Sequence, residues 1–469
     1  MSMNEIATMN SLRPLAALCA ATLLGACSQL PPQQRPDTPL PQAWAGLATT
    51  AAPAAPRDEE RDWRDFIVDP GLRTLVEQAL AANRDARIAA LQVEQLAAQY
   101  QIRRAALAPT VNLGLAASRQ TSDSNQSFKN SASAGLQISA WEIDFFGRLA
   151  SLREAALAQY LASEQAQRST RIGLVAAVAS GWLELQAGTA QLELTRQTLA
   201  SREQSLRLVR LRHDSGTASA LELRSAESLV ESARATLAQQ RLQQGQARHA
   251  LALLVGQPLD HALELPPAPE AGAPAALAEL APGLPAQVLL ERPDVRAAEQ
   301  QLAAASAQIG AARAAFFPRI ALTAAAGSAS SELSGLFKAG SWGWSLAPQA
   351  LLPIFDAGAN QAGLDSARAG REIALAQYEK AIQVAFREVS DSLLGRATLA
   401  EQLAAQQALA RAEAERLRLS GLRLQQGVAS QLDVLDAQRS LFAAEQALVQ
   451  TRYALLQNRV ALFKATAGR

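Results

Sequence analysis

Two stretches of the sequence without proline are each longer than any helix of an ordinary globular domain. No proline occurs from residue 110 to residue 257, nor from residue 354 to residue 469, whereas prolines cluster between these stretches. A helix from about Gly147 to His213 is roughly 100 Å long at 1.5 Å per residue. The sequence therefore predicts two zones of very long helices, joined by a proline-rich equatorial connector at 258–291.

The two helical zones belong to an internal duplication of about 200 residues. Asp85 to Arg87 resembles Asp294 to Arg296 at a spacing of 209 residues. Farther along the chain the spacing becomes 211, in the pairs Gly147 and Gly358, Val178 and Val389, Gly216 and Gly427, and Ser219 and Ser430. A period this long differs from the 20 to 50 residues of solenoid repeats. We therefore expect one structural repeat at 63–257 and a second at 292–469.

Within each repeat the apolar pattern changes from helical to alternating after a proline. Segments 84–107 and 292–316 are rich in alanine, glutamine, glutamate and arginine, and Pro109 and Pro318 stop them. Apolar and polar residues then alternate on either side of a long polar loop, which is typical of a β-hairpin. The hairpins are expected at about 110–140 and 319–348, so that the chain supplies four strands.

Leucines then recur every seven residues in both copies. The series are Leu185, Leu192, Leu199 and Leu206 in the first copy, and Leu403, Ala410, Leu417 and Leu424 in the second. Such seams predict long helices packed side by side with a left-handed twist. Gly216 and Gly427 are expected to interrupt the helices at tips near 214–221 and 425–432, before return helices begin.

The first 26 residues have the features of a secretory signal peptide. A short apolar run after Arg13 is too brief to span a bilayer, and it ends in Leu24-Gly-Ala-Cys27, which resembles a bacterial lipobox. Cys27 would then carry a diacylglycerol and become the mature N-terminus, with 27–62 as an extended tether behind the lipid. The alternative is an ordinary signal peptide cut near Ala26. Met9 is an alternative start to Met1.

Composition excludes several classes of protein. Forty-four basic against 43 acidic residues give a net charge of +1, which leaves no basic footprint for nucleic acid. His213, His249 and His261 match no metal-ligand spacing, so we expect no metal and no cofactor other than the lipid on Cys27. We find no phosphate-binding glycine loop and no nucleophile elbow, and therefore expect no enzyme.

Four strands cannot close a barrel by themselves. No apolar stretch of 18 residues follows Cys27, so any membrane crossing is expected from strands. An open sheet in lipid leaves edge amides and carbonyls unpaired, at several kcal/mol each. The chain is therefore expected to oligomerise, with a transmembrane β-barrel joined to a long α-helical barrel in the periplasm.

Several motifs in order make the chain similar to the TolC/OprM-like (NodT-type) outer-membrane factor lipoproteins of tripartite efflux systems. The motifs lie at Trp63–Leu72, Ala79–Asp85, Trp141–Arg148, Gly283–Glu299, Ala314–Pro318, Leu352–Gly358 and Gly427–Ala437. The resemblance implies a mainly α fold whose four β-strands per protomer close by trimerisation. The expected homotrimer has twelve strands and a twelve-helix barrel in the outer membrane and periplasm. Its partners would be a periplasmic adaptor protein and an inner-membrane RND-type transporter.

The resemblance also implies which residues form the periplasmic end. Asp433 and Asp436 match acidic positions that line the aperture, and Glu222 takes the corresponding place in the first repeat. An open alternative is that each carboxylate is a helix cap, since Ser430 precedes Asp433 by three residues. The expected adaptor-contacting tip consists of Gly216, Thr217, Ser219, Gly427, Val428 and Ser430, where the glycines also fit plain C-caps.

The function implied is passive conduction of drugs or other small toxic compounds, gated at the periplasmic tip. Type I protein secretion and heavy-metal efflux remain alternatives with the same fold, although methionine occurs only at positions 1, 3 and 9. A periplasmic coiled-coil lipoprotein without a pore is a further alternative. Tryptophans at 141, 342 and 344 near strand ends favour a channel, because tryptophan is enriched at bilayer interfaces.

Overall fold

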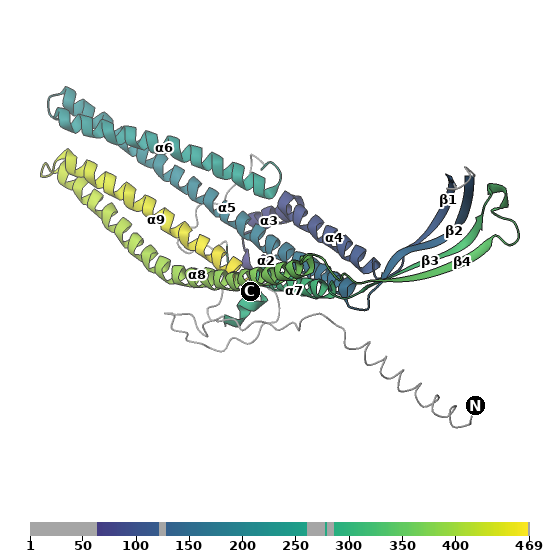
Figure 1. The fold of residues 1–469 in the computed structure, drawn as a ribbon. Coiled ribbons are helices and arrows are strands. Elements are labelled where there is room, and N and C mark those ends of the chain that lie inside the picture. Colours follow the sequence, from purple (N-terminus) through teal and green to yellow (C-terminus); the bar gives the residue numbers. More distant parts are fainter. Residues whose placement is uncertain (1–62, 122–127, 260–276, 279–285, 468–469) are drawn as a thin grey trace. The chain divides into compact units, whose positions relative to one another are not determined.

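The computed structural model describes residues 63–121, 128–259, 277–278 and 286–467. The predicted signal peptide, Cys27, the predicted tether and most of the predicted connector lie outside the described residues. The helices are α2 (Trp63–Phe66), α3 (Pro70–Ala82), α4 (Arg84–Ala105), α5 (Arg148–Asp214), α6 (Ala220–Val255), η1 (Ala286–Glu291), α7 (Pro293–Ala314), η2 (Leu333–Gly335), α8 (Ala359–Gln425) and α9 (Gln431–Ala465) (Figure 1). The strands are β1 (Val111–Thr121), β2 (Phe128–Ile143), β3 (Arg319–Ser330) and β4 (Trp342–Leu351). The predicted mainly helical chain with four strands is confirmed.

The described residues fall into two compact units. The sheet unit contains residues 91–165 and 296–380, and the hairpin unit contains the described parts of 63–90, 166–295 and 381–467. Helices α5 and α8 have 67 residues each and contribute to both units. Among the described helices, none is both long enough and apolar enough to cross a membrane.

In the sheet unit, the strands form one antiparallel sheet in the order β1-β2-β3-β4. Each predicted hairpin pairs internally, and the additional pairing of β2 with β3 joins the two repeats, as between Ala132 and Ser330. A shift in register between Ile138 and Trp141 interrupts that pairing, next to Ala140 with φ of 47°. Strand β2 therefore bends at this bulge, where the local twist increases.

The register gives the sheet one apolar and one polar face. Leu113, Leu136 and Trp344 lie in one row across the sheet, and Leu113 is 74% and Trp344 71% exposed. The opposite face carries small and polar side chains, such as Ser118 and Ser131, whose hydroxyls lie 2.8 Å apart. Because large apolar side chains are usually covered in water-soluble proteins, this exposed face marks a contact surface.

A row of four glycines crosses the polar face of the sheet. Gly114 pairs with Gly135, Gly135 with Gly327, and Gly327 with Gly343. A methyl group on Gly135 would lie 2.5 Å from the carbonyl oxygen of Ala326, so β2 and β3 approach too closely there for any side chain. Nothing lies within 4 Å of a methyl group on Gly343. The inner pair of glycines is therefore required by the approach of the backbones.

The hairpin unit has its main core where α2 and α3 meet α5, α6 and α9. Asp69 begins α3 by accepting a hydrogen bond from the Leu72 amide at 2.8 Å. Phe66 stacks on Phe463 of α9 with ring centroids 4.4 Å apart. Trp182 of α5 is fully buried in the same cluster. The short helices α2 and α3 thereby pack against the much longer helices α5, α6 and α9.

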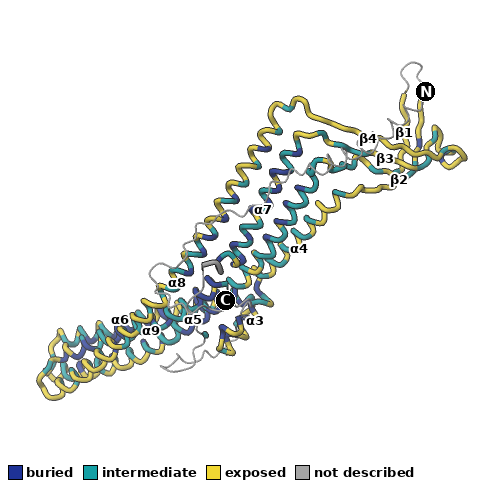
Figure 2. The backbone as a smooth tube through the Cα atoms, turned by 90° about the horizontal axis from the view of Figure 1, so that it is seen from below, coloured by how far each residue is buried: buried dark blue, intermediate teal, exposed yellow. Residues whose placement is uncertain are grey.

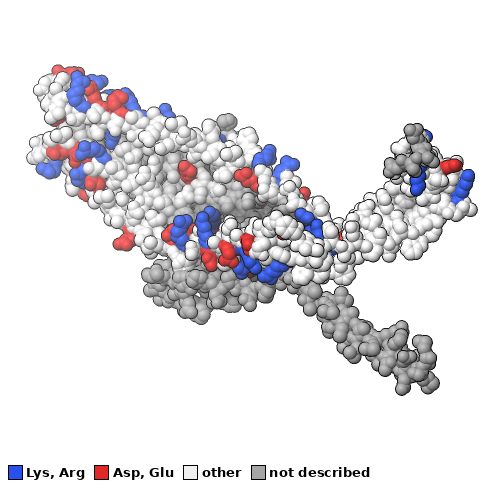
Figure 3. Space-filling view, in the orientation of Figure 1, with Lys and Arg blue, Asp and Glu red and all other residues white. Residues whose placement is uncertain are grey.

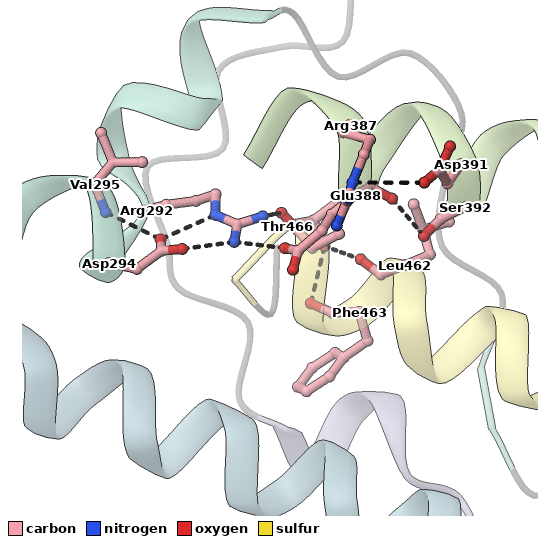
Figure 4. A network of polar contacts seen from close by, with 11 residues as sticks. Arg292, Asp294, Val295, Arg387, Glu388, Asp391, Ser392, Leu462, Phe463 and Thr466 are labelled. Atoms are coloured by element: carbon pink, nitrogen blue, oxygen red, sulfur yellow. Dashed lines mark hydrogen bonds and ion pairs between the residues drawn. The ribbon is translucent and has the colours of Figure 1, made fainter. Parts of the chain in front are cut away.

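A buried arginine joins three elements of the hairpin unit (Figure 4). Arg292 is 4% exposed and donates to Asp294 at 2.7 Å, to Glu388 of α8 at 2.7 Å and to the carbonyl oxygen of Ala465 at 2.7 Å. Burial opposes ionisation of Asp294, but the hydrogen bonds and charge of Arg292 outweigh it and lower the pKa of Asp294. The C-terminal end of α9 is thus held by the segment that begins α7.

We predict that Arg292→Met destabilises the protein by about 3 kcal/mol, because it leaves two carboxylates and a carbonyl without their donor. The matched control is Arg387→Met, since Arg387 is 71% exposed and lies 3.9 Å from Asp391. Its cost should stay below about 0.5 kcal/mol. Urea unfolding in detergent measures both.

The ion pair of Arg292 and Asp294 also makes the stability of the protein depend on pH. Because the folded pKa of Asp294 is lowered, its contribution is complete above the unfolded pKa of about 4 and is lost as pH falls through the folded pKa. The stability difference between wild type and Arg292→Met should therefore shrink in acid. A difference that is unchanged from neutral pH to about pH 3 would contradict this account.

Candidate functional site

The turns after α5 and α8 share one backbone design. Gly216 and Gly427 have φ of 75° and 73°, a left-handed conformation that favours glycine. The Thr217 amide donates to the carbonyl of Arg212 at 2.8 Å, and the Val428 amide donates to that of Arg423 at 2.9 Å. Both glycines therefore end their helices as C-caps, as one open interpretation of the sequence expected.

A capping box begins the return helix at each turn. Ser219 and Ser430 are the N-caps, and their amides donate to Glu222 at 2.7 Å and to Asp433 at 2.9 Å. Hydrogen bonds from the Ser430 amide and then the Ser430 hydroxyl lower the pKa of Asp433, and the charge of Arg423 acts in the same direction. Glu222 and Asp433 thus occupy equivalent positions as helix caps. Their aperture role stays a prediction.

Asp436 has different partners. It accepts hydrogen bonds from Arg439 on the same helix at 2.5 Å and from Arg416 on α8 at 3.4 Å. The sequence alone predicts the contact of Asp436 with Arg439, because residues three apart on a helix are neighbours. Arg416 precedes Asp436 by 20 residues on another helix, so only the structure reveals this partner.

Asp433 and Asp436 lie together in a groove between α6 and α9, which we call the tip groove. Its volume is about 670 Å³, and it is lined by Arg224, Ser225, Ser228, Leu229, Leu432, Asp433, Leu435, Asp436 and Arg439. Glu222 is absent from these lining residues. The structure therefore brings two of the three predicted aperture carboxylates to one surface, each close to an arginine.

Helices α5 and α9 are held side by side below the tips. Gln438 of α9 donates to the Ser205 hydroxyl at 3.1 Å, and Arg212 donates to Gln431 at 3.5 Å. Arg202 is buried, donates to the Leu229 carbonyl at 3.0 Å and lies 4.9 Å from the ring centre of Phe442. Burial lowers the pKa of Arg202. These contacts connect one hairpin of helices to the other.

The predicted tip residues are at the surface. All six are exposed: Gly216, Thr217, Ser219, Gly427, Val428 and Ser430. Figure 2 shows mostly exposed backbone at this end of the long helices. Val428 is 65% exposed, and Leu221 and Leu432 are exposed beside the two turns. On the face in Figure 3, charged side chains gather near the tips of the hairpins, whereas the sheet carries few. Exposed apolar side chains within a charged surround are typical of a protein-binding surface.

Comparison with protein families finds one match that covers most of the chain. The family model described as "Outer membrane efflux protein" matches residues 75–257 and 284–468. The two matched segments correspond closely to the two repeats, and the gap between them falls in the proline-rich connector.

Curated relatives and solved structures agree with that match. Outer membrane protein OprJ of Pseudomonas aeruginosa is 44% identical over 460 residues, covering 97% of this chain and 95% of the relative. The toluene efflux pump outer membrane protein TtgF of Pseudomonas putida is 45% identical over 466 residues, covering 96% of each. The open state of the Neisseria gonorrhoeae MtrE outer membrane channel superposes with a TM-score of 0.82 at 35% identity, covering 94% of this chain and 98% of that one.

We predict that Ser430→Ala destabilises the first turn of α9 by about 1 kcal/mol, because the Asp433 amide loses its acceptor. Hydrogen exchange should accelerate in the first turn of α9, while the first turn of α6 keeps its rate. Ser219→Ala is the matched control and should produce the reverse pattern. Equal acceleration at both turns in either variant would refute independent caps.

Proposed function

The chain belongs to the outer membrane efflux protein family, and we propose that it is the outer-membrane duct of a three-part pump that conducts small toxic compounds. The observation that carries the proposal is the two-faced sheet continued by helices of 67 residues. Since relatives are named for toluene efflux, aromatic solvents are the first class of cargo to test. Conduction of this kind requires a passage and no catalysis.

We propose that three copies close the sheet. Strands β1 and β4 are the outer strands of the described sheet, and each leaves one row of amides and carbonyls without a strand partner. Pairing of β1 in one copy with β4 in the next would satisfy both rows in a ring of about twelve strands. The apolar face with Leu113 and Trp344 would then contact lipid, and the polar face with the glycine row would surround the passage.

The exposed tips suit a periplasmic adaptor. Val428, Leu221 and Leu432 offer apolar contacts, and the surrounding charged residues would set the register of a partner. An inner-membrane transporter of the RND type would complete the pump, as the sequence resemblance implies.

Gating is proposed at the same end. Around a threefold axis, Asp433 and Asp436 would repeat as acidic rings that favour cations. Opening would require the α8–α9 hairpin to move against α5–α6, so the contacts of Arg202 and Gln438 across the hairpins would oppose it. Asp433 would then have two roles, as a cap and as part of the aperture.

Lipidation at Cys27 is proposed as a second attachment to the outer membrane. The lipobox resemblance supports it, and an acyl anchor adds about 0.8 kcal/mol per buried methylene. The tether at 27–62 would connect this anchor to α2.

We predict that replacing Asp433 and Asp436 together with alanine raises single-channel conductance in planar bilayers about twofold or more and weakens block by multivalent cations, because two acidic rings are removed. Asp214→Ala is the matched control: it removes an exposed tip carboxylate outside the tip groove and should leave both properties unchanged. Wild-type conductance and block in the double variant would exclude these carboxylates from the gate.

We predict that Cys27→Ser abolishes incorporation of labelled fatty acid in cells. Cys19→Ser is the matched control, since Cys19 lies in the apolar run that is expected to be removed, and labelling should persist. The measurement is fluorography of the purified protein. Labelled Cys27→Ser protein would disprove the lipobox assignment.

A further inference from the structure

Four arginines surround a second groove in the hairpin unit, far along the sequence from the tips. The groove has a volume of about 660 Å³ and lies between the junction of α3 and α4 and the N-terminal half of α5. Arg84 and Arg87 of α4 and Arg168 and Arg171 of α5 line it, and we call it the arginine groove.

The lining of this groove carries no acidic side chain. Its remaining residues are neutral: Leu80, Ala81, Ala82, Asn83, Ala86, Ala90 and Gln167. Several other arginines of the hairpin unit have carboxylates close by, as Arg234 has Glu203 at 2.8 Å and Arg224 has Glu227 at 2.7 Å. Among the described residues, none of the four groove arginines lies within 4.0 Å of a carboxylate oxygen. The groove is thus a local excess of positive charge in a chain whose net charge is only +1.

The spacing of the four arginines along their helices explains why all of them line one groove. Each pair is three residues apart on its helix, which places both members on one helical face. Like charges at this spacing repel each other, and two such pairs facing one groove add to the repulsion. An anion between the helices would relieve it.

The start of α4 is held firmly beside the groove. The Asn83 side-chain amide donates to the Leu254 carbonyl of α6 at 2.8 Å, and its oxygen accepts from the Ala86 amide at 3.0 Å. Asn83 is itself buried. Arg84 and Arg87 therefore project from a helix end whose backbone is fixed, so this side of the groove is preorganised for a ligand.

We propose that the arginine groove is a binding site for an anion with two or more carboxylate or phosphate groups. Guanidinium groups bind both acids through paired, charge-assisted hydrogen bonds. One acidic group would engage Arg84 and Arg87 and another would engage Arg168 and Arg171. The inference is independent of the proposed conduction, since it concerns a separate site with its own ligand.

The test is calorimetric titration of the full-length protein in detergent with pyrophosphate and, separately, with citrate. Binding is expected for both probes at about 20 mM salt and should weaken strongly at about 200 mM salt, because screening acts on exposed charges. Binding of only one probe would limit the site to phosphate or to carboxylate and would overturn the shared chemistry proposed. Conductance is not measured, so failure of the duct proposal would not affect this result.

Two double variants test the residues. Arg168→Gln with Arg171→Gln, and Arg84→Gln with Arg87→Gln, should each weaken pyrophosphate binding about tenfold or more. The matched control is Arg103→Gln with Arg104→Gln at the other end of α4, which removes the same charge from exposed positions outside the groove. It should bind within about twofold of wild type.

Three further outcomes would overturn the proposal. Equal weakening in the control would indicate a general effect of net charge. Unchanged binding in both groove variants would indicate an adventitious ion only. Absence of binding by the wild type, together with loss of the oligomer in the groove variants, would indicate that carboxylates of a second copy of the chain fill the groove.

Discussion

The need to pair every backbone amide and carbonyl in lipid governs this molecule. The described residues form one sheet of four strands with an exposed apolar face, and its outer strands β1 and β4 have no strand partner among them. In water such an edge invites aggregation, and in a bilayer it costs several kcal/mol per unpaired group. In the proposed trimer, association of copies would remove this cost by pairing β1 of one copy with β4 of the next. The proposed duct rests on this requirement.

Much of the fold was predictable because it depends on local patterns. Pro109 and Pro318 end helices, and Gly216 and Gly427 end the long helices at the expected turns, since both effects act over a few residues. The pairing of β2 with β3 depends on contact between distant segments and had no local signal. The glycine row was not predictable either, because Gly135 and Gly327 become neighbours only through the register of β2 with β3.

The helix tips were predictable only where their contacts are local in sequence. The capping boxes of Ser219 and Ser430 follow a four-residue pattern, which made a cap one open interpretation of Asp433. The pairing of Arg416 with Asp436 joins two helices and was missed. The duplication also hides a difference: Ser225 in the first repeat stands where Asp436 stands in the second. In the tip groove, Ser225 and Ser228 of α6 contribute hydroxyls at the positions where α9 has Asp436 and Arg439, and α6 adds one charge through Arg224.

The pairing of β2 with β3 also constrains the order of folding. The whole α5–α6 hairpin and the connector lie in sequence between these strands, so Ala132 cannot meet Ser330 until that intervening chain has been synthesised. Contacts of such high sequence separation form slowly, whereas the helices depend on local contacts and form early. The complete apolar surface of the sheet is therefore assembled last. Before β2 pairs with β3, the apolar surface of the sheet is divided between two separate hairpins, each with its own unpaired edges.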